Sequence, residues 1–334
     1  MKATITWDVS PTAWTAFLER TPNATFFHSA GWYATHAAVA AYRPRAVHLQ
    51  FEDGAEALLP LAVSRRYRGL VQVAQAGIES GYGGLVSPAP LTDAHVRAAY
   101  RLVRDRYPDL EVAGSPFSAD EGALVGGEAS PSGTQIVPVM APDAQMRAMN
   151  AKRAARVRKS AKVGFELTVV EAPTEARVAD FYALYAAHAS YWQYAKWVRD
   201  EAYFRALLRH AGEHLTLFLV HLDGELAGFR LLARQGDHAL GLHLATTRTH
   251  EKLDVGPFMI GATLNWCHAH GCRTFDFLPS GPLDGVQAYK ASYGAEAMPF
   301  WSASATSLTG RGLSAAWGWM RRARPAPLAP AAGA

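Results

Sequence analysis

The pattern that most constrains this fold is a pair of hairpin signals, one in each half of the chain. Residues 46–52 alternate apolar and polar side chains before Asp53-Gly54, and residues 57–64 read as the partner strand. Residues 215–221 and 226–234 likewise read as strands on either side of Asp223-Gly224. An Asp-Gly pair between two alternating segments is a strong signal for antiparallel strands joined by a tight turn. Further strands and a helical segment follow each hairpin. The sequence therefore predicts an α/β (α+β) chain whose halves each form a mixed, mostly antiparallel sheet flanked by helices.

The length of 334 residues favours two units, because single hydrophobic cores stop growing at about 250–300 residues. We predict an N-terminal domain over residues 1–145 and a C-terminal domain over residues 146–310. Hydrophobic residues make up 49% of the chain and charged residues 19%, which is enough apolar material for two cores. Residues 122–133, rich in Gly, Ser and Pro, are predicted as a loop, and residues 325–334 as a disordered tail.

Cysteine content and hydropathy indicate the cellular compartment of the protein. Residues 1–10 read as a strand and lack the apolar run of a signal peptide, and charges interrupt every candidate membrane span. The two cysteines, Cys267 and Cys272, fit a reducing compartment. With His268 and His270 they lack the paired spacing of a zinc site, so no metal is predicted. We expect a cytoplasmic monomer.

Positive charge is concentrated in one segment. From Lys152 to Lys162 the chain carries six Lys or Arg residues and no acid, and the tail after Arg311 adds more Arg. Such a cluster suits an anionic partner such as tRNA, a pyrophosphate or the inner membrane surface, while a solvated helix face is the alternative. The helical period turns Ala154, Val157 and Ala161 to the core. It leaves these cations outward: Lys152, Arg153, Arg156 and Lys159.

A second segment is unusually aromatic. Residues 179–210 are predicted as a helix, and the part from 181 to 197 holds seven aromatic residues where the composition of the chain predicts about two. Core packing explains about half of them. We expect the group from Tyr191 to Trp197, including Trp192, to line an acceptor site, where aromatic rings stack on a sugar or a base.

Four motifs together resemble the Fem family, the FemABX-type peptidyltransferases within the GNAT acyltransferase superfamily. The two most specific are the Lys/Arg-rich helix ending in Gly and the signature around Phe275-Asp276-Phe277 and Lys290. The resemblance covers nearly the whole chain, and it implies two tandem GNAT-like domains. The segments that carry it are Thr21–Trp32, Tyr82–Val86, Lys152–Gly164 and Phe275–Gly294.

The resemblance also implies a reaction. Fem enzymes form an amide bond between an activated aminoacyl donor and an amine of a cell-wall peptide precursor. The family's characteristic lysine falls on Lys290, where an ammonium can stabilise a developing oxyanion or hold the donor. Lys290 is therefore the predicted catalytic residue. The predicted substrate-binding residues are Tyr82, Lys152, Arg153, Arg156, Trp192, His243 and Tyr289.

The donor is inferred from a missing loop. GNAT domains that use acetyl-CoA carry an Arg/Gln-x-x-Gly-x-Gly/Ala loop at a helix start, whose amides bind pyrophosphate. Here Arg248 lies eight residues before Gly256, and Pro257 removes one amide. We therefore predict aminoacyl-tRNA as donor and no cofactor. The alternatives are an acyl-CoA-dependent N-acyltransferase acting on a sugar or other small amine, and a non-catalytic protein that binds RNA or an envelope precursor. His243 stands where Fem enzymes usually have Tyr, which leaves the acceptor open.

Overall fold

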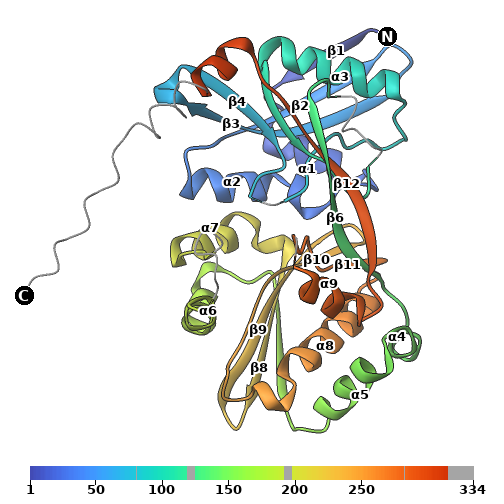
Figure 1. Cartoon of the computed structure of the whole chain (residues 1–334), viewed down its shortest axis with the longest axis vertical. Helices are drawn as coiled ribbons and strands as arrows, with labels where there is room; N and C mark the ends of the chain where they lie inside the picture. The colour runs from blue at the N-terminus through green and yellow to red at the C-terminus, as the bar shows by residue number, and fades with distance from the viewer. Residues whose placement is uncertain (80, 119–124, 192–197, 282, 315–334) are drawn as a thin grey trace, which may run out of the picture.

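The computed structural model describes residues 1–79, 81–118, 125–191, 198–281 and 283–314 (Figure 1). Within them, twelve strands form one continuous sheet. They are β1 (Ala3–Trp7), β2 (Arg43–Phe51), β3 (Glu56–Arg66), β4 (Val71–Ala76), β5 (Asp109–Ala113), β6 (Glu128–Pro138), β7 (Glu166–Glu171), β8 (Leu215–Leu222), β9 (Glu225–Gln235), β10 (His238–Thr246), β11 (Thr274–Asp276) and β12 (Glu296–Ala305). Their order is β1-β2-β3-β4-β5-β12-β6-β11-β10-β9-β8-β7.

Helices cover both faces of this sheet. Several begin at a polar side chain that accepts a bond from a free backbone amide of the first turn: Ser10, Asn150 and Asp200 do so. The α-helices are α1 (Pro11–Glu19), α2 (Ala30–Val39), α3 (Asp93–Arg106), α4 (Pro142–Ala148), α5 (Ala151–Ser160), α6 (Tyr182–Ala189), α7 (Glu201–Ala211), α8 (Val255–Ala269) and α9 (Asp284–Ala291).

Both predicted hairpins are confirmed. β2 and β3 pair antiparallel up to Gln50 opposite Glu56, and β8 and β9 pair up to Leu222 opposite Glu225. In the second turn Asp223 and Gly224 both have positive φ, 52° and 80°, which is the conformation that Asp-Gly turns adopt. The local pattern alone therefore places these four strands.

Two predicted segments are wrong. Residues 122–133 are not simply a loop, because β6 begins at Glu128 and pairs with β12 over its first nine residues. This pairing with a distant strand overrides the turn-like composition. Residues 179–210 do not form one helix, because α6 ends at Ala189 and α7 begins after the cap at Asp200. The predicted tail at 325–334 lies outside the described residues.

The strands β6 and β12 join the two halves of the molecule. β12 pairs with β5 on one side and with β6 on the other, and β6 pairs in turn with β11. Figure 1 shows these two strands running from the upper lobe, which holds β1–β5, into the lower lobe, which holds β7–β11. The C-terminal strand thus extends the sheet of the first half, across the predicted domain boundary at residues 145 and 146.

The largest hydrophobic core also spans both halves. It contains Phe26, Phe27 and Trp32 from the first half and Phe204 and Phe229 from the second. Here α2 packs directly on α7, side by side between the lobes in Figure 1. The helices are so close that a Cβ on Gly31 would lie 2.5 Å from the carbonyl oxygen of His210. The two lobes therefore bury a common apolar interface.

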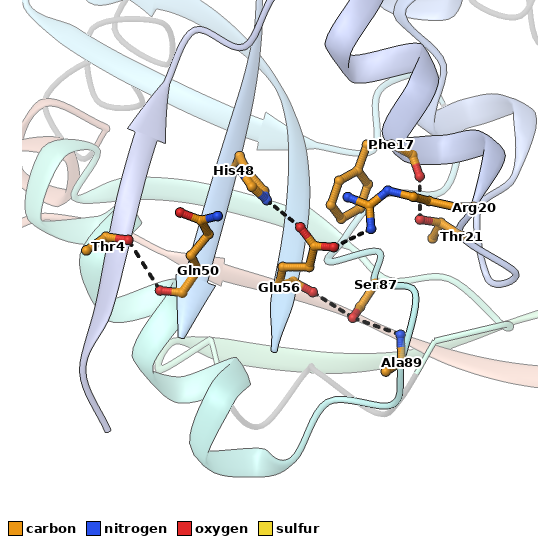
Figure 2. A network of polar contacts seen from close by, with 9 residues as sticks. All are labelled: Thr4, Phe17, Arg20, Thr21, His48, Gln50, Glu56, Ser87 and Ala89. Atoms are coloured by element: carbon orange, nitrogen blue, oxygen red, sulfur yellow. Dashed lines mark hydrogen bonds and ion pairs between the residues drawn. The ribbon is translucent and has the colours of Figure 1, made fainter. Parts of the chain in front are cut away.

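A polar network ties α1 to the first hairpin (Figure 2). The carboxylate of Glu56 on β3 accepts from Arg20 at the end of α1 and lies 3.0 Å from Nε2 of His48 on β2. The backbone oxygen of Glu56 accepts from the Ser87 hydroxyl at 2.7 Å. Because Arg20 and Glu56 are partly exposed, this network orients the loop at Ser87 more than it stabilises the fold.

Gly83 provides a test of the loop after β4. A Cβ at this position would lie 2.1 Å from the backbone of Ala76 and Gly77, so we expect Gly83→Ala to lower the free energy of unfolding by about 3 kcal/mol. The control is Gly285→Ala in α9, where a Cβ meets nothing within 4 Å. The control should be neutral or gain about 0.5–1 kcal/mol. Urea unfolding followed by circular dichroism measures both, and equal effects would contradict this account.

Candidate active site

Two neighbouring strands of the second half separate at their carboxyl ends. β10 and β11 pair in parallel only from His238 opposite Thr274 to Leu240 opposite Asp276. Beyond that point β10 continues along β9 with a shift of register between Gly241 and His243, whereas β11 ends. We call this divergence the β10–β11 fork. Sites in α/β sheets commonly lie at such carboxyl ends.

The carboxylate of Asp276 lies at this fork and is fully buried. Its Oδ2 accepts from the Tyr82 hydroxyl at 2.5 Å, and its Oδ1 accepts from the Thr134 hydroxyl at 2.6 Å and from the Leu278 amide at 2.7 Å. Burial raises the pKa of Asp276, and these three donors oppose the rise. Burial, together with the Asp276 charge, raises the pKa of Tyr82 well above its ordinary value. Tyr82, predicted to bind substrate, has its hydroxyl occupied by this carboxylate.

Lys290 reaches the same place from α9. Its side chain is buried, with 8% exposure for the residue, and its Nζ donates to the carbonyl oxygen of Leu278. Burial lowers the pKa of Lys290 to about 8; the Asp276 carboxylate opposes this shift and the Arg230 guanidinium adds to it. At neutral pH the side chain is thus mainly an ammonium. Its bond to Leu278, two positions after Asp276 in the chain, holds it near that carboxylate. Such a group can stabilise negative charge that develops in a reaction.

Arg153 packs against α9 instead of pointing outward as predicted. Its guanidinium carbon lies 4.5 Å from the ring centre of Tyr289 and 4.7 Å from that of Tyr293, and its Nε donates to the Ser292 hydroxyl at 2.9 Å. The prediction treated α5 as an isolated amphipathic helix, whereas the aromatic face of α9 covers this position. Tyr289, also predicted to bind substrate, lies with its hydroxyl 3.1 Å from that of Tyr293.

Arg156 is paired as well. It forms an ion pair with Asp254, a buried residue with left-handed backbone that directly precedes α8. Hydrogen bonding to Asp254 raises the pKa of Arg156. Ala161, expected in the core, is exposed. Arg156 is nevertheless exposed, as are Lys152, Arg158, Lys159 and Lys162.

The other face of β10 is aromatic, with the Arg199–Glu79 ion pair beside its rings. His243 packs among rings of α6 and α7, and its Nε2 lies 3.1 Å from the Tyr203 hydroxyl. Burial lowers the pKa of His243 to about 3, so it is uncharged at neutral pH. Trp192, predicted for this side, lies outside the described residues. The structure thus gathers Tyr82, Lys290, Tyr289 and Arg153 near the fork, with His243 on the opposite face and Lys152 at the surface.

Sequence reasoning missed two charged residues of this region, Arg230 and Asp254. Gly228 and Leu232 on β9 face α8, and Arg230 lies midway between them. Because side chains alternate along a strand, Arg230 faces the same side of the sheet. A signal was present, because a charged residue at an inward position of an otherwise apolar strand is rare without a partner. Asp254 offered no such pattern, since acids commonly precede helices.

Comparison with known proteins agrees with this architecture. Residues 147–291 match a family model described as an acetyltransferase (GNAT) domain. A crystal structure of FemX superposes with a TM-score of 0.70 at 13% identity, covering 90% of this chain and 97% of that one. The chain has a FemABX-like tandem GNAT fold. The predicted fold and resemblance are thereby confirmed.

Other tandem structures show the same FemABX-like arrangement. L-PGS from Bacillus licheniformis matches with a TM-score of 0.55 and 12% identity over 94% of this chain and 96% of that one. A tandem GNAT protein from the clavulanic acid biosynthesis pathway matches with a TM-score of 0.50 and 16% identity over 91% and 99%. No curated protein matches by sequence.

The part of the chain that the structure describes holds no group of three or more His, Cys, Asp or Glu side chains placed to bind a metal ion. Among its helices none combines the length and the apolar character needed to cross a bilayer.

Removing the Tyr82 hydroxyl tests the Asp276 contacts. Tyr82→Phe leaves Oδ2 of a buried carboxylate without its donor, so the free energy of unfolding should fall by about 2 kcal/mol. Tyr191→Phe is the control, because Tyr191 is 60% exposed and should change stability by less than about 0.5 kcal/mol. Urea titration of both variants measures the difference. A Tyr82→Phe protein as stable as the control would refute a structural role for this bond.

The depressed pKa of Lys290 makes stability depend on pH. Between its folded value of about 8 and its ordinary value of 10.5, the unfolded chain binds more protons, so wild-type stability rises with pH in this window. Lys290→Met lacks this gain. Between about pH 7 and pH 9.5, wild type should therefore gain on the order of 2 kcal/mol relative to the variant, measured by urea unfolding. A constant difference would show that Lys290 titrates normally.

Proposed function

We propose that this protein is an acyltransferase that joins an activated aminoacyl group, carried by tRNA, to an amine of a cell-wall peptide precursor. The FemABX-like fold supports the reaction class. The observation that carries the proposal is the buried ammonium of Lys290 at the β10–β11 fork, on the residue where the Fem resemblance places its characteristic lysine.

The proposed step needs no covalent enzyme intermediate. A neutral acceptor amine attacks the carbonyl carbon of the aminoacyl ester, and a C–N bond forms as the carbonyl oxygen becomes an oxyanion. Lys290 would stabilise that oxyanion by its charge. The ester C–O bond then breaks, the carbonyl re-forms, and the proton lost by the amine passes to the departing ribose hydroxyl. Holding both substrates at the fork supplies the orientation.

Asp254 supports an aminoacyl donor over acyl-CoA. The start of a helix attracts anions because its backbone amides and dipole are positive, and a CoA pyrophosphate would lie there. In this chain the buried carboxylate of Asp254 stands directly before α8 and pairs with Arg156. A pyrophosphate at that position would have to displace the Asp254 carboxylate from Arg156. Together with Pro257 in the first turn, this ion pair makes the helix start a poor CoA site.

The exposed cations of α5 and the turn after it support an anionic partner. Because Arg153 and Arg156 are held by α9 and Asp254, the contacts to phosphate would come from Lys152 and its exposed neighbours. These side chains suit the phosphates of tRNA or of a pyrophosphate-bearing precursor at the membrane surface.

The second candidate is an acyl-CoA-dependent N-acyltransferase that modifies a sugar or another small amine. It is favoured by the match of residues 147–291 to an acetyltransferase domain model. A muropeptide precursor incubated with the protein and either charged tRNA or acetyl-CoA separates the two, with mass spectrometry as readout. A gain of one amino-acid residue, abolished by ribonuclease, supports the first function. An acetyl gain that ribonuclease leaves unchanged supports the second.

Lys290→Met tests the catalytic assignment. Loss of a charge that acts on the oxyanion should lower kcat by about 100-fold or more, with a smaller change in the affinity for the acceptor. Lys2→Met, on the exposed surface before β1 and outside the proposed phosphate-binding cluster, is the matched control and should keep its kcat. If Lys290→Met transfers at the wild-type rate, Lys290 has no catalytic role. If neither protein transfers while both bind the precursor, the chain is a binding protein.

A further inference from the structure

Arg230 is a buried cation without a counter-ion. The residue is 4% exposed, and neither its Nε nor its Nη1 has a hydrogen-bond partner among the described residues. Its guanidinium carbon lies 5.1 Å from the ring centre of Phe275. Leaving a buried guanidinium without acceptors costs several kcal/mol, and nearly all buried charges in folded proteins are paired. The site therefore calls for an anion that the chain itself does not supply.

The guanidinium lies at the inner end of the β10–β11 fork. A Cβ on Gly241 would lie 3.0 Å from Nη1 of Arg230 and 3.2 Å from Cζ of Phe275. Gly241 is also the residue at which the register of β10 shifts, just after the pairing with β11 ends. A glycine here thus keeps open the space between the arginine and the separating strands.

The charges around the fork select a ligand with one negative charge. Two buried cations, Arg230 and Lys290, and one buried acid, Asp276, lie in this region. The charges of Arg230 and Asp276 both act on the pKa of Lys290. Two positive charges stand against the single negative charge of Asp276, so one positive charge remains uncompensated. Arg153 stands farther out and is half-buried, and its guanidinium lies over the rings of Tyr289 and Tyr293. A carboxylate restores neutrality, whereas a phosphate dianion would leave an excess of negative charge.

We propose that Arg230, assisted by Lys290, binds the carboxylate of a substrate at the inner end of the β10–β11 fork. The planar guanidinium offers parallel N–H donors that match two carboxylate oxygens. Arg230 lies on the α8 side of the sheet, opposite the aromatic side around His243. In the proposed function, on which this reading rests, the carboxylate belongs to the side chain of an acidic aminoacyl donor, because the donor's α-carboxyl is esterified.

Thermal unfolding tests the site without any assumption about catalysis. Sodium acetate should raise the unfolding midpoint of wild type by roughly 2 °C over sodium chloride of equal ionic strength, at about ten times the acetate Kd. Acetamide, which has the same shape without charge, should have no effect. Arg230→Met should lose the acetate shift and keep or raise its midpoint in chloride, because it removes an uncompensated charge. Arg234→Met on the same strand, whose Nε donates to Gly236, should keep the shift.

A second variant keeps the proposal testable if Arg230→Met fails to fold. Gly241→Ala retains both cations but fills the space beside Nη1, so it should lose most of the acetate shift. An equal acetate shift in wild type and in either variant overturns the site. A shift with inorganic phosphate but none with acetate overturns the carboxylate assignment.

A comparison of aminoacyl-tRNA donors separates this inference from the proposed function. Wild type should use aspartyl- or glutamyl-tRNA at least about tenfold better than the asparaginyl or glutaminyl counterparts, and Arg230→Lys should reduce that preference. If transfer occurs with no such preference, the acidic donor is wrong while the proposed function stands. If acetate binds as predicted but no aminoacyl-tRNA is used, the proposed function fails and the carboxylate site remains.

Discussion

The candidate site depends on the hydrogen bonds that the buried carboxylate of Asp276 accepts. A carboxylate removed from water is tolerated only when donors replace its hydration, and here those donors come from Tyr82 in the first half, from Thr134 on β6 and from the backbone after β11. Both halves must therefore be folded and docked before the acid is satisfied. The bond to Leu278 also fixes the backbone that turns away from β10 with a φ of 65°, and the oxygen of Leu278 receives Lys290.

This arrangement gives the β10–β11 fork two faces of different chemistry. On the α8 side lie the cations Arg230 and Lys290, with Arg153 over the rings of Tyr289 in α9 and Tyr293 just after it. On the other side His243 is neutral among the rings of α6 and α7.

The basic helix shows how tertiary contacts change the meaning of a charge cluster. Six cations in eleven residues indicated one phosphate-binding face. In the folded chain Arg153 packs on aromatic rings and Arg156 neutralises Asp254 at the start of α8, so two of the six hold neighbouring elements together. The four cations without these contacts, Lys152, Arg158, Lys159 and Lys162, form a smaller patch than the sequence indicated.

What could be predicted from the sequence rests on short-range physics. The Asp-Gly turns, the capped helices and the two-fold order of elements depend on neighbours along the chain, and the motif around Lys290 pointed to the right end of β11. Tertiary structure alone decided the rest. β6 becomes a strand only because β12, more than 150 residues later, pairs with it. Asp276 is satisfied by donors from both halves, whereas Nε and Nη1 of Arg230 find no partner among the described residues. Such outcomes depend on long-range pairing and on competition for buried charge, which no local pattern encodes.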